Sequence, residues 1–405
     1  MLQFMRENAA FLLAGGILTF TSSFGQTFFI SIFAGEIKAE FGLSDGDWGY
    51  IYTLGTTLSA LVFAWAGTLV DRFRVKGLAL TVLPGLAVAC LSMAVAPSGL
   101  WLIGVVFLLR IFGQGMTSHL ATVAMARWFI ARRGMALSLA AMGFALGQAV
   151  LPLAFEAMKR WFDWHTLWVI AAVIVCLILP VVLRLLRLER TPQSIATEAE
   201  VAGMDGRHWT RPDVLRHPIF WLMVPALIGP PAWGTALFFH QVHLAEVKGW
   251  TMLEWLSLMP VFTAVMVCAT LLSGQAIDRF GATRLMSVFM LPYGIAFAVI
   301  GIAPGIWVAG LGLLILGLGQ GMMGTVPSAF WAELFGTRHI GSIKAGAAAL
   351  MVFGSAIGPG ITGQLIDWGI DFPTQSLALA LYFAVGGGFA ALATSRARSA
   401  LAAAA

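Results

Sequence analysis

The chain has 405 residues, of which 59% are hydrophobic and only 11% are charged, and its mean hydropathy is +0.88. Soluble domains carry roughly 25% charged residues, so this composition excludes a soluble protein. The net charge of +5 and the pI near 9.4 would suit a nucleic-acid-binding protein, but the basic residues lie in loops between apolar stretches. The sequence therefore predicts an integral membrane protein whose charge reflects its topology.

Apolar stretches of about 20 residues recur along the whole sequence, and each is long enough to cross a hydrocarbon core of roughly 30 Å as a helix. The predicted fold class is all-α and integral to the membrane, with twelve transmembrane helices in two pseudo-symmetric six-helix halves. The expected spans are 10–33, 48–70, 77–96, 100–126, 134–157, 165–186, 218–245, 253–277, 284–303, 306–330, 341–366 and 375–395.

The three cysteines, Cys90, Cys176 and Cys268, all fall inside apolar stretches, which argues against disulfides and against a cysteine-based metal site. No cofactor and no metal are expected. No cleavage site at signal-peptide spacing follows the first span, so this span is expected to be retained. The sequence contains no HExxH, no GxSxG and no paired intramembrane carboxylates, so an enzyme is not expected.

Basic residues predict the topology of the chain. With both termini on one side, all but five of the 24 Lys and Arg residues fall on that side. The exceptions are Lys38, Lys159, Arg160 and Lys248 in the opposite loops and Arg110 within a span. By the positive-inside rule both termini are expected to be cytoplasmic, in a multi-pass protein of the cell membrane, with the bacterial inner membrane as the expected location.

One long polar stretch divides the sequence. It runs from about Arg187 to His217, between the sixth and seventh spans, and contains five of the 19 acidic residues. The expected organisation is an N-terminal six-helix half at 1–186, a cytoplasmic linker at 187–217 and a C-terminal six-helix half at 218–405.

The second half of the sequence repeats the first. An apolar stretch that reaches Gly-Gln-Gly, passes a Met and ends in Ala-x-x-Phe occurs at 108–129 and again at 313–335. Gln114 and Gln320 lie 206 residues apart in these copies. The first copy carries a charge at Arg110, where the second has an apolar Leu316. This asymmetry predicts that Arg110 serves the function rather than the scaffold.

Polar residues concentrate in the first, fourth, seventh and tenth spans, whereas the third, sixth, ninth and twelfth are almost wholly apolar. Polar groups are costly in lipid, so the first set of helices is expected to line a shared aqueous cavity and the second set to face lipid. The candidate substrate-binding residues in the cavity-lining helices are Ser23, Gln26, Arg110, Gln114, Trp233, His240, Gln241 and Gln320.

Two loop motifs and two glycine patterns carry a family resemblance. The loop motifs read GTLVDRFRVK at 67–76 and GQAIDRFGATR at 274–284, and LLRIFGQG at 108–115 is an Arg followed by a Gly-rich turn. The glycine patterns, GFALGQAVLP from Gly143 and GSAIGPG from Gly354, suit close helix packing. Over essentially the whole chain these features resemble the major facilitator superfamily of secondary transporters. Arg74 replaces the usual second glycine of the first loop motif, which Gly281 retains in the second.

The resemblance implies a carrier that works by alternating access and acts as a monomer. It also implies a gating role for the acid and base pairs of the two loop motifs, which would bridge helices and separate as the halves rock. The pairs are Asp71 with Arg72 and Asp278 with Arg279. The alternative is that these residues only anchor a tight turn at the membrane interface.

Arg110 lies about ten residues into a span, near the bilayer middle. Its insertion costs roughly 2.5–3.5 kcal/mol even on lenient scales, so it is expected to face water or a partner rather than lipid. Three roles remain open: binding a substrate anion, tuning a proton relay, or hydrogen-bonding helix ends as a structural clamp.

The other candidates also have structural alternatives. His240 is the best placed titratable group for proton coupling, because a histidine titrates near working pH, but it could equally be a hydrogen-bonded packing residue. The glutamines could bind substrate or one another across helices. Trp233 could form an aromatic wall or lie at the membrane interface.

The expected function is secondary transport of a small organic anion, such as a monocarboxylate, with a proton or by exchange. The ligands would be this small molecule and possibly protons, with no nucleic acid. The first alternative is an exporter of amphipathic compounds or drugs, suggested by the apolar, aromatic-rich and Met-rich spans. The alternative of another class is a non-transporting membrane sensor.

Overall fold

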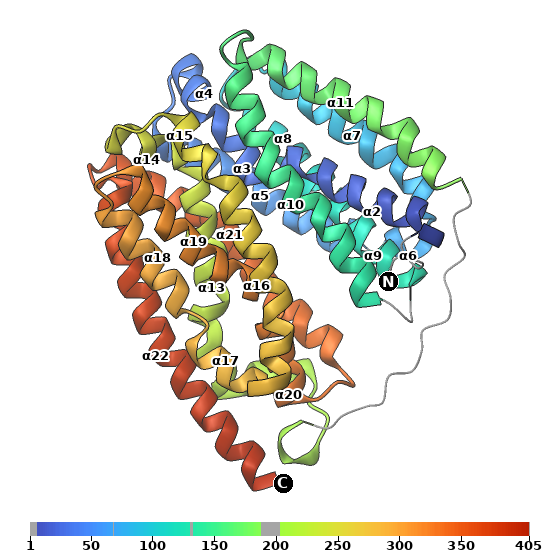
Figure 1. Cartoon of the computed structure of the whole chain (residues 1–405), viewed down its shortest axis with the longest axis vertical. Coiled ribbons are helices and arrows are strands. Elements are labelled where there is room, and N and C mark those ends of the chain that lie inside the picture. Colours follow the sequence, from blue (N-terminus) through green and yellow to red (C-terminus); the bar gives the residue numbers. More distant parts are fainter. Residues whose placement is uncertain (1–5, 68, 130–132, 188–202, 405) are drawn as a thin grey trace. The chain divides into compact units, whose positions relative to one another are not determined.

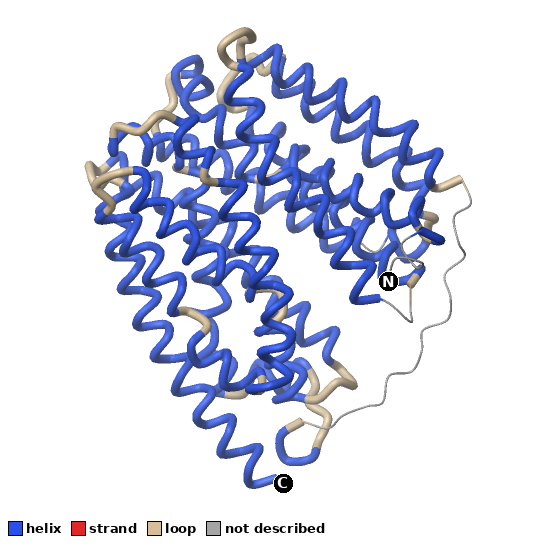
Figure 2. The backbone as a smooth tube through the Cα atoms, in the orientation of Figure 1, coloured by secondary structure: helices blue, strands red, loops and turns tan. Residues whose placement is uncertain are grey.

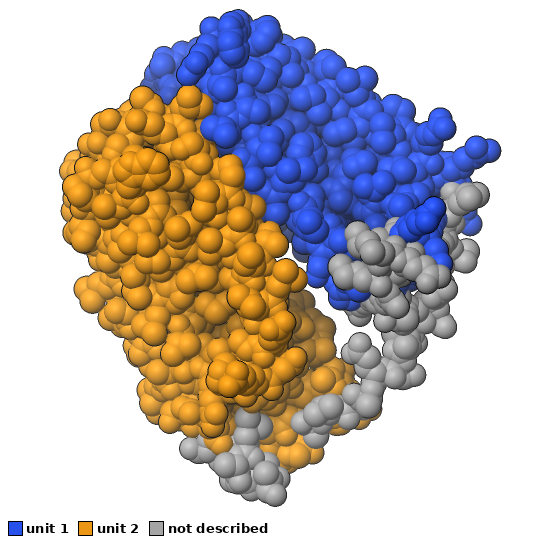
Figure 3. Space-filling view, viewed as in Figure 1, with its two compact units in different colours: residues 1–197 blue, residues 198–405 orange. Residues whose placement is uncertain are grey.

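The protein is described from a computed structural model, which covers residues 6–67, 69–129, 133–187 and 203–404. Within these ranges every regular element is a helix and there is no strand (Figure 2). The chain divides into two compact units, unit 1 at 1–197 and unit 2 at 198–405 (Figure 3). The expected linker at 187–217 thus includes the boundary, although residues 188–202 lie outside the described part.

Unit 1 starts with a span that is built from several short helices. The unit also contains long helices, of which α7 and α11 pack side by side (Figure 1). The elements are α2 (Ala9–Thr21), η1 (Ser22–Gly25), α3 (Thr27–Ile30), η2 (Ser31–Phe33), α4 (Ala34–Phe41), α5 (Asp45–Ala66), α6 (Leu69–Arg72), α7 (Val75–Ala94), α8 (Trp101–Leu108), η3 (Leu109–Thr117), α9 (Ser118–Trp128), α10 (Arg133–Met158) and α11 (Trp164–Leu185).

Unit 2 begins with a folded part of the expected linker and continues into its own set of spans. Its elements are η5 (Met204–Gly206), α12 (Arg211–Arg216), α13 (Pro218–Phe239), α14 (Gln241–Lys248), α15 (Met252–Ser257), α16 (Met259–Phe280), α17 (Ala282–Val288), α18 (Leu291–Ile302), α19 (Ile306–Met322), α20 (Val326–Phe335), α21 (Ile340–Asp367) and α22 (Phe372–Ala404).

The all-helical membrane fold is confirmed, but the count of twelve spans is not reproduced in full. In the described residues ten helices are long and apolar enough to cross a membrane, or eleven if the bent pair Ala9–Gly25 and Thr27–Phe41 is one span. The expected second span corresponds to α5, which has 22 residues but is not among them. The polar residues of α5, including Asp45, Asp47 and Thr56, lower its hydropathy.

The repeat is visible in the way the first and seventh spans end. Gly42 and Gly249 lie 207 residues apart, and each closes an eight-residue helix in the left-handed conformation, with φ of 63° and 70°. In the next helix of each unit Ser44 or Thr251 forms a capping box with the acid three residues later. A glycine meets the positive φ without a Cβ clash and the capping boxes satisfy free N–H groups, so the same local chemistry reverses the chain twice.

Close glycine contacts hold the first span of each unit against the fifth. A Cβ on Gly143 of α10 would lie 1.8 Å from the carbonyl oxygen of Gly16 in α2. In unit 2 a Cβ on Gly358 of α21 would lie 2.2 Å from the carbonyl oxygen of Ala232 in α13. Small residues allow two backbones to approach in a membrane, where helices associate through packing. Each crossing therefore fixes the first span of its own unit against the fifth.

Candidate functional site

The first span breaks in the middle of unit 1. Gln26 has an extended conformation, with φ −89° and ψ 151°, between η1 and α3. The helices on the two sides of this break are bent by 51°. Secondary transporters commonly build binding sites around such discontinuous helices, because the interruption leaves backbone groups for ligands or side chains. Gly25 lies directly before the break.

The fourth span is also irregular where it meets this break. Leu109–Thr117 forms a π-helix, and the Thr117 hydroxyl donates a hydrogen bond of 2.6 Å to the Phe112 carbonyl. A Cβ on Gly113 would lie 2.6 Å from the Cα of Gly25, so the two backbones touch. π-helical turns are rare and occur frequently at functional sites. Two irregular segments therefore cross at one point.

Arg110 is buried at this crossing, with 3% of its surface exposed. Its Nη1 donates to the Gly25 carbonyl and to the Thr27 hydroxyl, both at 3.4 Å. Its guanidinium carbon lies 5.4 Å from the centre of the Tyr52 ring. Nε has no hydrogen-bond acceptor among the described residues. An arginine has five N–H donors, so two long contacts at one nitrogen leave most of its hydrogen-bonding capacity unused.

Two neighbours of Arg110 escaped prediction from the sequence. Thr27 and Tyr52 share a short hydrogen bond between their hydroxyls, and Tyr52 is fully buried. Neither residue type is unusual in a membrane span, so composition gave no reason to select them. The comparison of the two sequence copies, which singled out Arg110, is the signal that could have found both.

The other candidates of unit 1 differ in accessibility. Gln26 and Gln114 are partly exposed at the crossing of the first and fourth spans. Ser23 is fully buried, and its hydroxyl oxygen lies 2.1 Å from where a Cβ on Gly147 would be. That hydroxyl has no hydrogen-bond partner in the described part of the chain. Ser23 thus faces the fifth span rather than an open surface.

His240 and Gln241 of unit 2 lie where α13 gives way to α14. His240 is 2% exposed, and its Nε2 lies 3.1 Å from the Pro359 carbonyl oxygen of α21. Gln241 is fully buried and accepts a hydrogen bond of 3.0 Å from the Trp255 indole N–H. Both side chains are therefore engaged with the protein in this conformation.

Trp233 and Gln320 are the remaining candidates of unit 2. The ring of Trp233 packs edge-on against Tyr382 of α22, with ring centres 5.6 Å apart. Its indole N–H has no acceptor within the described ranges. The Gln320 amide nitrogen lies 2.9 Å from where a Cβ on Gly234 would be, so it lies against the seventh span. Trp233 thus packs from α13 against α22, whereas Gln320 of α19 lies against α13.

The loop motif of unit 2 is organised by a residue that the sequence did not single out. Asp278 and Arg279 are exposed, and Gly281 follows with a φ of 81°. Glu333 of α20 accepts hydrogen bonds from the backbone N–H of Ala282 at 3.0 Å and from the Thr283 hydroxyl at 2.8 Å. A carboxylate is favoured at a helix N-terminus, which explains its place at the start of α17.

The corresponding loop motif of unit 1 is described only in part. Asp71 and Arg72 end α6, but their side chains lie outside the described structure. Arg127 of α9 donates a hydrogen bond of 2.7 Å to the Val70 carbonyl of α6. The gating role of Asp71, Arg72, Asp278 and Arg279 stays a prediction.

The folded end of the expected linker is tied to unit 2. Trp209 is buried, and its ring lies 5.4 Å from Phe335 and 5.1 Å from His217, between ring centres. Burial is the main cause that lowers the pKa of His217. The hydroxyl of Thr210, together with its backbone N–H, lowers the pKa of Asp213 by hydrogen-bonding to its carboxylate. These residues are a structured part of unit 2 rather than a free connection.

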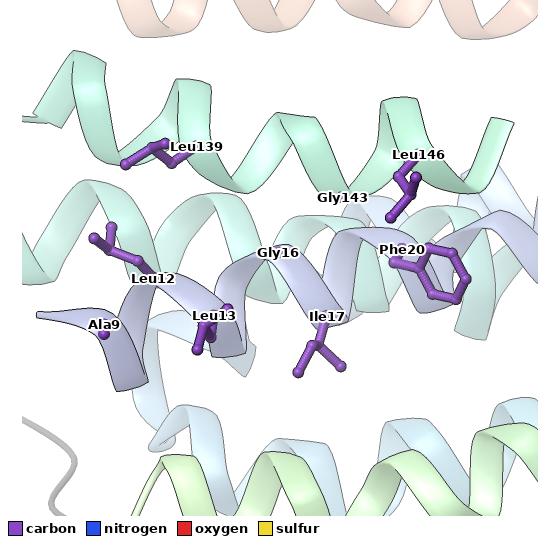
Figure 4. A pocket seen from close by; sticks show the side chains of 9 residues that line it. All are labelled: Ala9, Leu12, Leu13, Gly16, Ile17, Phe20, Leu139, Gly143 and Leu146. Carbon is purple, nitrogen blue, oxygen red and sulfur yellow. The ribbon is translucent and has the colours of Figure 1, made fainter. Parts of the chain in front are cut away.

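An apolar groove runs between α2 and α10 (Figure 4). It has a volume of about 530 Å³, and its sides are formed by leucine, isoleucine and phenylalanine side chains. Gly16 and Gly143 form its floor, where the two helices touch. The groove provides no charged side chain, and it therefore suits a hydrocarbon group. Among the described residues no three His, Cys, Asp or Glu side chains are grouped to hold a metal ion.

An all-helical chain with many apolar spans, two repeated units and irregular helices around a buried arginine defines a multi-pass membrane carrier. The sequence profile of the Major Facilitator Superfamily matches residues 15–359. The chain belongs to this superfamily, and it is a transporter rather than an enzyme. A search of curated proteins finds no significant match to the chain.

Solved structures share the fold. A bacterial homologue of the human lysosomal transporter Spinster, inward-facing and unoccupied, aligns with a TM-score of 0.71 at 16% identity, over 97% of this chain and 98% of its own. Its inward-facing, occupied form gives 0.71 at 18% identity, with 96% of each chain covered. A point mutant of the nucleoside transporter NupG gives 0.68 at 12% identity, over 96% of this chain and 99% of its own.

Proposed function

We propose that the protein is a secondary active transporter of a small, monocarboxylate-like organic anion, working by alternating access. The observation that carries the proposal is the buried Arg110, whose Nε has no acceptor in the described part of the chain. A guanidinium binds a carboxylate through two parallel hydrogen bonds, and such charge-assisted bonds are about twice as strong as neutral ones. A carboxylate would supply both the missing acceptors and the missing charge.

The break in the first span supports the same assignment. The only acceptors that the described protein offers Arg110 are the Gly25 carbonyl and the Thr27 hydroxyl, and both are neutral and distant at 3.4 Å. A buried, unpaired charge is costly in a membrane, where ionisable residues commonly mark substrate or ion pathways. Because Nε is enclosed in this conformation, ligand entry requires the helices around Gln26 to move.

Proton coupling or exchange completes the proposed cycle. His240 is the candidate proton carrier, because it lies at the junction of α13 and α14 and reaches α21 through the Pro359 carbonyl. Gln114 and Gln26 would contribute hydrogen bonds to the substrate, and a substrate-binding role of Gln320 stays a prediction. The protein would act as a monomer in the bacterial inner membrane, with both termini cytoplasmic, as the distribution of Lys and Arg indicates.

A second candidate function is export of amphipathic compounds. It is favoured by the groove between α2 and α10, which is lined by apolar side chains over about 530 Å³. Two of its leucines, Leu13 and Leu146, are exposed. Such a surface binds hydrocarbon but offers no partner to an anion, so the two candidates predict different ligands.

A thermal-shift measurement on purified protein separates the candidates, because a ligand that binds the native state raises its stability. The first panel holds small organic anions and the second holds amphipathic cations. We expect stabilisation by anions in the wild-type protein and its loss in Arg110→Gln, while the exposed Arg184→Gln serves as the control. Stabilisation confined to the cations would replace the anion carrier with the exporter.

Flux into proteoliposomes separates a carrier from a membrane sensor. A carrier accumulates the labelled anion against its gradient when a proton gradient or an exchangeable anion is supplied. A sensor would bind the same anion without accumulating it. Arg110→Gln should lower the uptake rate at low substrate concentration by at least tenfold, which corresponds to about 1.4 kcal/mol of lost binding.

A further inference from the structure

Because the sequence is repeated, each position in unit 1 can be compared with the equivalent position in unit 2. Residues that serve the shared scaffold should be alike in the two copies, whereas residues that serve the substrate can differ. The positions retained about 207 residues apart include a buried tryptophan, a buried threonine and a helix proline. These pairs are Trp48 and Trp255, Thr56 and Thr263, and Pro152 and Pro359.

Three residues that touch one another in unit 1 all differ in unit 2. Arg110 corresponds to Leu316, Tyr52 to Met259 and Thr27 to Gly234. Their neighbours along the same helices, Trp48, Thr56 and Gln114, are retained. In unit 2 all three polar residues are thus replaced, two by apolar side chains and one by glycine. They change together although they come from three different spans.

The contacts of unit 1 explain why the three residues change together. The Thr27 hydroxyl accepts from Arg110 Nη1 at 3.4 Å and shares a hydrogen bond with the Tyr52 hydroxyl. The Tyr52 ring lies beside the guanidinium, 5.4 Å from its carbon. If Arg110 were replaced by an apolar residue, the Tyr52 ring and the two hydroxyls would no longer have a guanidinium to interact with. In unit 2 the space next to Gly234 is taken by the Gln320 amide.

We propose that Tyr52 and Thr27 are positioning residues of the anion site, which hold the Nη1 side of Arg110 and leave Nε for a carboxylate. The proposal rests on the proposed function and extends it. The carboxylate-binding group of Arg110, Thr27 and Tyr52 belongs to the first repeat alone. Its preference for a carboxylate over the neutral amide of the same acid depends on the two hydroxyls. Tyr52 is assigned a positioning role because its hydroxyl is hydrogen-bonded to Thr27 and its ring lies beside the guanidinium of Arg110.

A charged side chain with one edge held is pre-organised for its ligand. A free arginine loses side-chain entropy when it binds, whereas an arginine oriented by Tyr52 and Thr27 has already lost part of it. Removing one hydroxyl should therefore weaken carboxylate binding without abolishing it. Removing Arg110 should abolish the preference for the charged ligand.

The experiment compares variants that separate each group. Tyr52→Phe keeps the ring and removes the hydroxyl, and Thr27→Val removes the other hydroxyl at nearly constant volume. Thr27→Ser restores that hydroxyl. Tyr52→Met uses the residue that the second repeat carries at this position. The control is Thr263→Val, a buried threonine of unit 2 outside the site, whose hydroxyl has no hydrogen-bond partner in the described residues.

The probes are acetate, pyruvate and benzoate, each beside its neutral amide, measured by thermal shift and by uptake into proteoliposomes. We expect Tyr52→Phe and Thr27→Val to raise the KM for the carboxylate about tenfold and to leave the binding of the amide unchanged. Thr27→Ser and Thr263→Val should remain within about twofold of the wild type. The melting temperature without ligand reports folding separately.

The outcomes separate this inference from the proposed function. If no carboxylate stabilises the wild-type protein, the anion carrier itself is wrong. If Tyr52→Phe and Thr27→Val both bind a carboxylate as well as the wild type does, the positioning role is wrong. If Arg110→Gln has lost that binding in the same experiment, the anion site itself is retained. Should Tyr52→Phe fail to fold, the same comparison is decided by Tyr52→Met and by the pair Thr27→Val and Thr27→Ser.

Discussion

Lys159 shows how this chain satisfies a charge near the end of a span. Its ammonium lies 2.6 Å from the Ile32 carbonyl oxygen, 2.7 Å from a Glu36 carboxylate oxygen and 3.0 Å from a Glu156 carboxylate oxygen. One carbonyl and two carboxylates thus surround an ammonium group that has three donors. Arg110 differs, because Nε of its larger donor set has no partner in the described structure. This contrast is what we expect if Lys159 is a structural cation and Arg110 binds a ligand, as proposed.

Asp371 provides a prediction at the residue scale. Its carboxylate accepts a hydrogen bond of 2.8 Å from the backbone N–H of Thr374. Hydrogen bonds from the Thr374 side chain and backbone are the main causes that lower its pKa, and His243 and Lys248 add to the effect. A lowered folded-state pKa stabilises the protein above the ordinary value near 3.9, and this contribution is lost as pH falls through the folded value.

Asp371→Ala should therefore lower the free energy of unfolding by about 1 kcal/mol at pH 7, as the loss of an N-terminal helix cap does. The difference from the wild type should shrink below about pH 4, because the carboxylate is protonated first in the unfolded state and only at lower pH in the folded state. Thermal unfolding in detergent at pH 7.5, 5 and 3.5 measures it. The matched control is Glu246→Ala, at an exposed position of α14. A difference that is constant across this range would contradict the role of the charge.

Helix crossings decide which substitutions the elements tolerate. A Cβ on Gly143 would lie 1.8 Å from the Gly16 carbonyl oxygen, whereas a Cβ on Gly134 of the same helix meets nothing within 4 Å. The backbone of α2 cannot move without opening the crossing. The two glycines of α10 therefore form a matched pair, one at the crossing and one in open space.

Gly143→Ala should destabilise the protein by roughly 1–3 kcal/mol, the usual cost of overpacking. Gly134→Ala should be neutral or stabilising by up to about 1 kcal/mol, because alanine favours the helix. Melting temperatures of the two purified variants, measured beside the wild type, test this. Equal melting temperatures would mean that α2 and α10 are not in contact through their backbones.

The elements could be predicted from the sequence more completely than their interruptions. The apolar stretches indicated the spans, and the glycine patterns indicated close helix packing without showing that α2 is the partner of α10. The break at Gln26 and the π-helix over Leu109–Thr117 were not predicted. Neither break contains a proline, and hydropathy averaged over a span is insensitive to a single interrupted turn.

At the scale of the whole molecule, the basic residues predict one orientation in the membrane. In the variant Arg338→Cys we expect the new cysteine to react with an impermeant maleimide only from the cytoplasmic side. In Arg160→Cys we expect the reaction only from the outside. Both positions are exposed, and the three native cysteines would first be replaced. Labelling of intact cells and of inverted vesicles measures the sidedness. The reverse pattern would overturn the positive-inside assignment.

The sequence by itself determined the class of the protein and its helical repeat, and it singled out Arg110 as a candidate. Hydropathy, charge and a spacing of about 207 residues are properties of the chain, which need no knowledge of how helices rotate. Only the tertiary structure decided which groups surround Arg110, because Thr27 and Tyr52 come from other spans. The rotation and crossing of helices also placed Ser23 against Gly147 and Trp233 against Tyr382. A polar residue in an apolar helix can face a cavity or a neighbouring helix at similar cost, so its pattern alone does not distinguish the two.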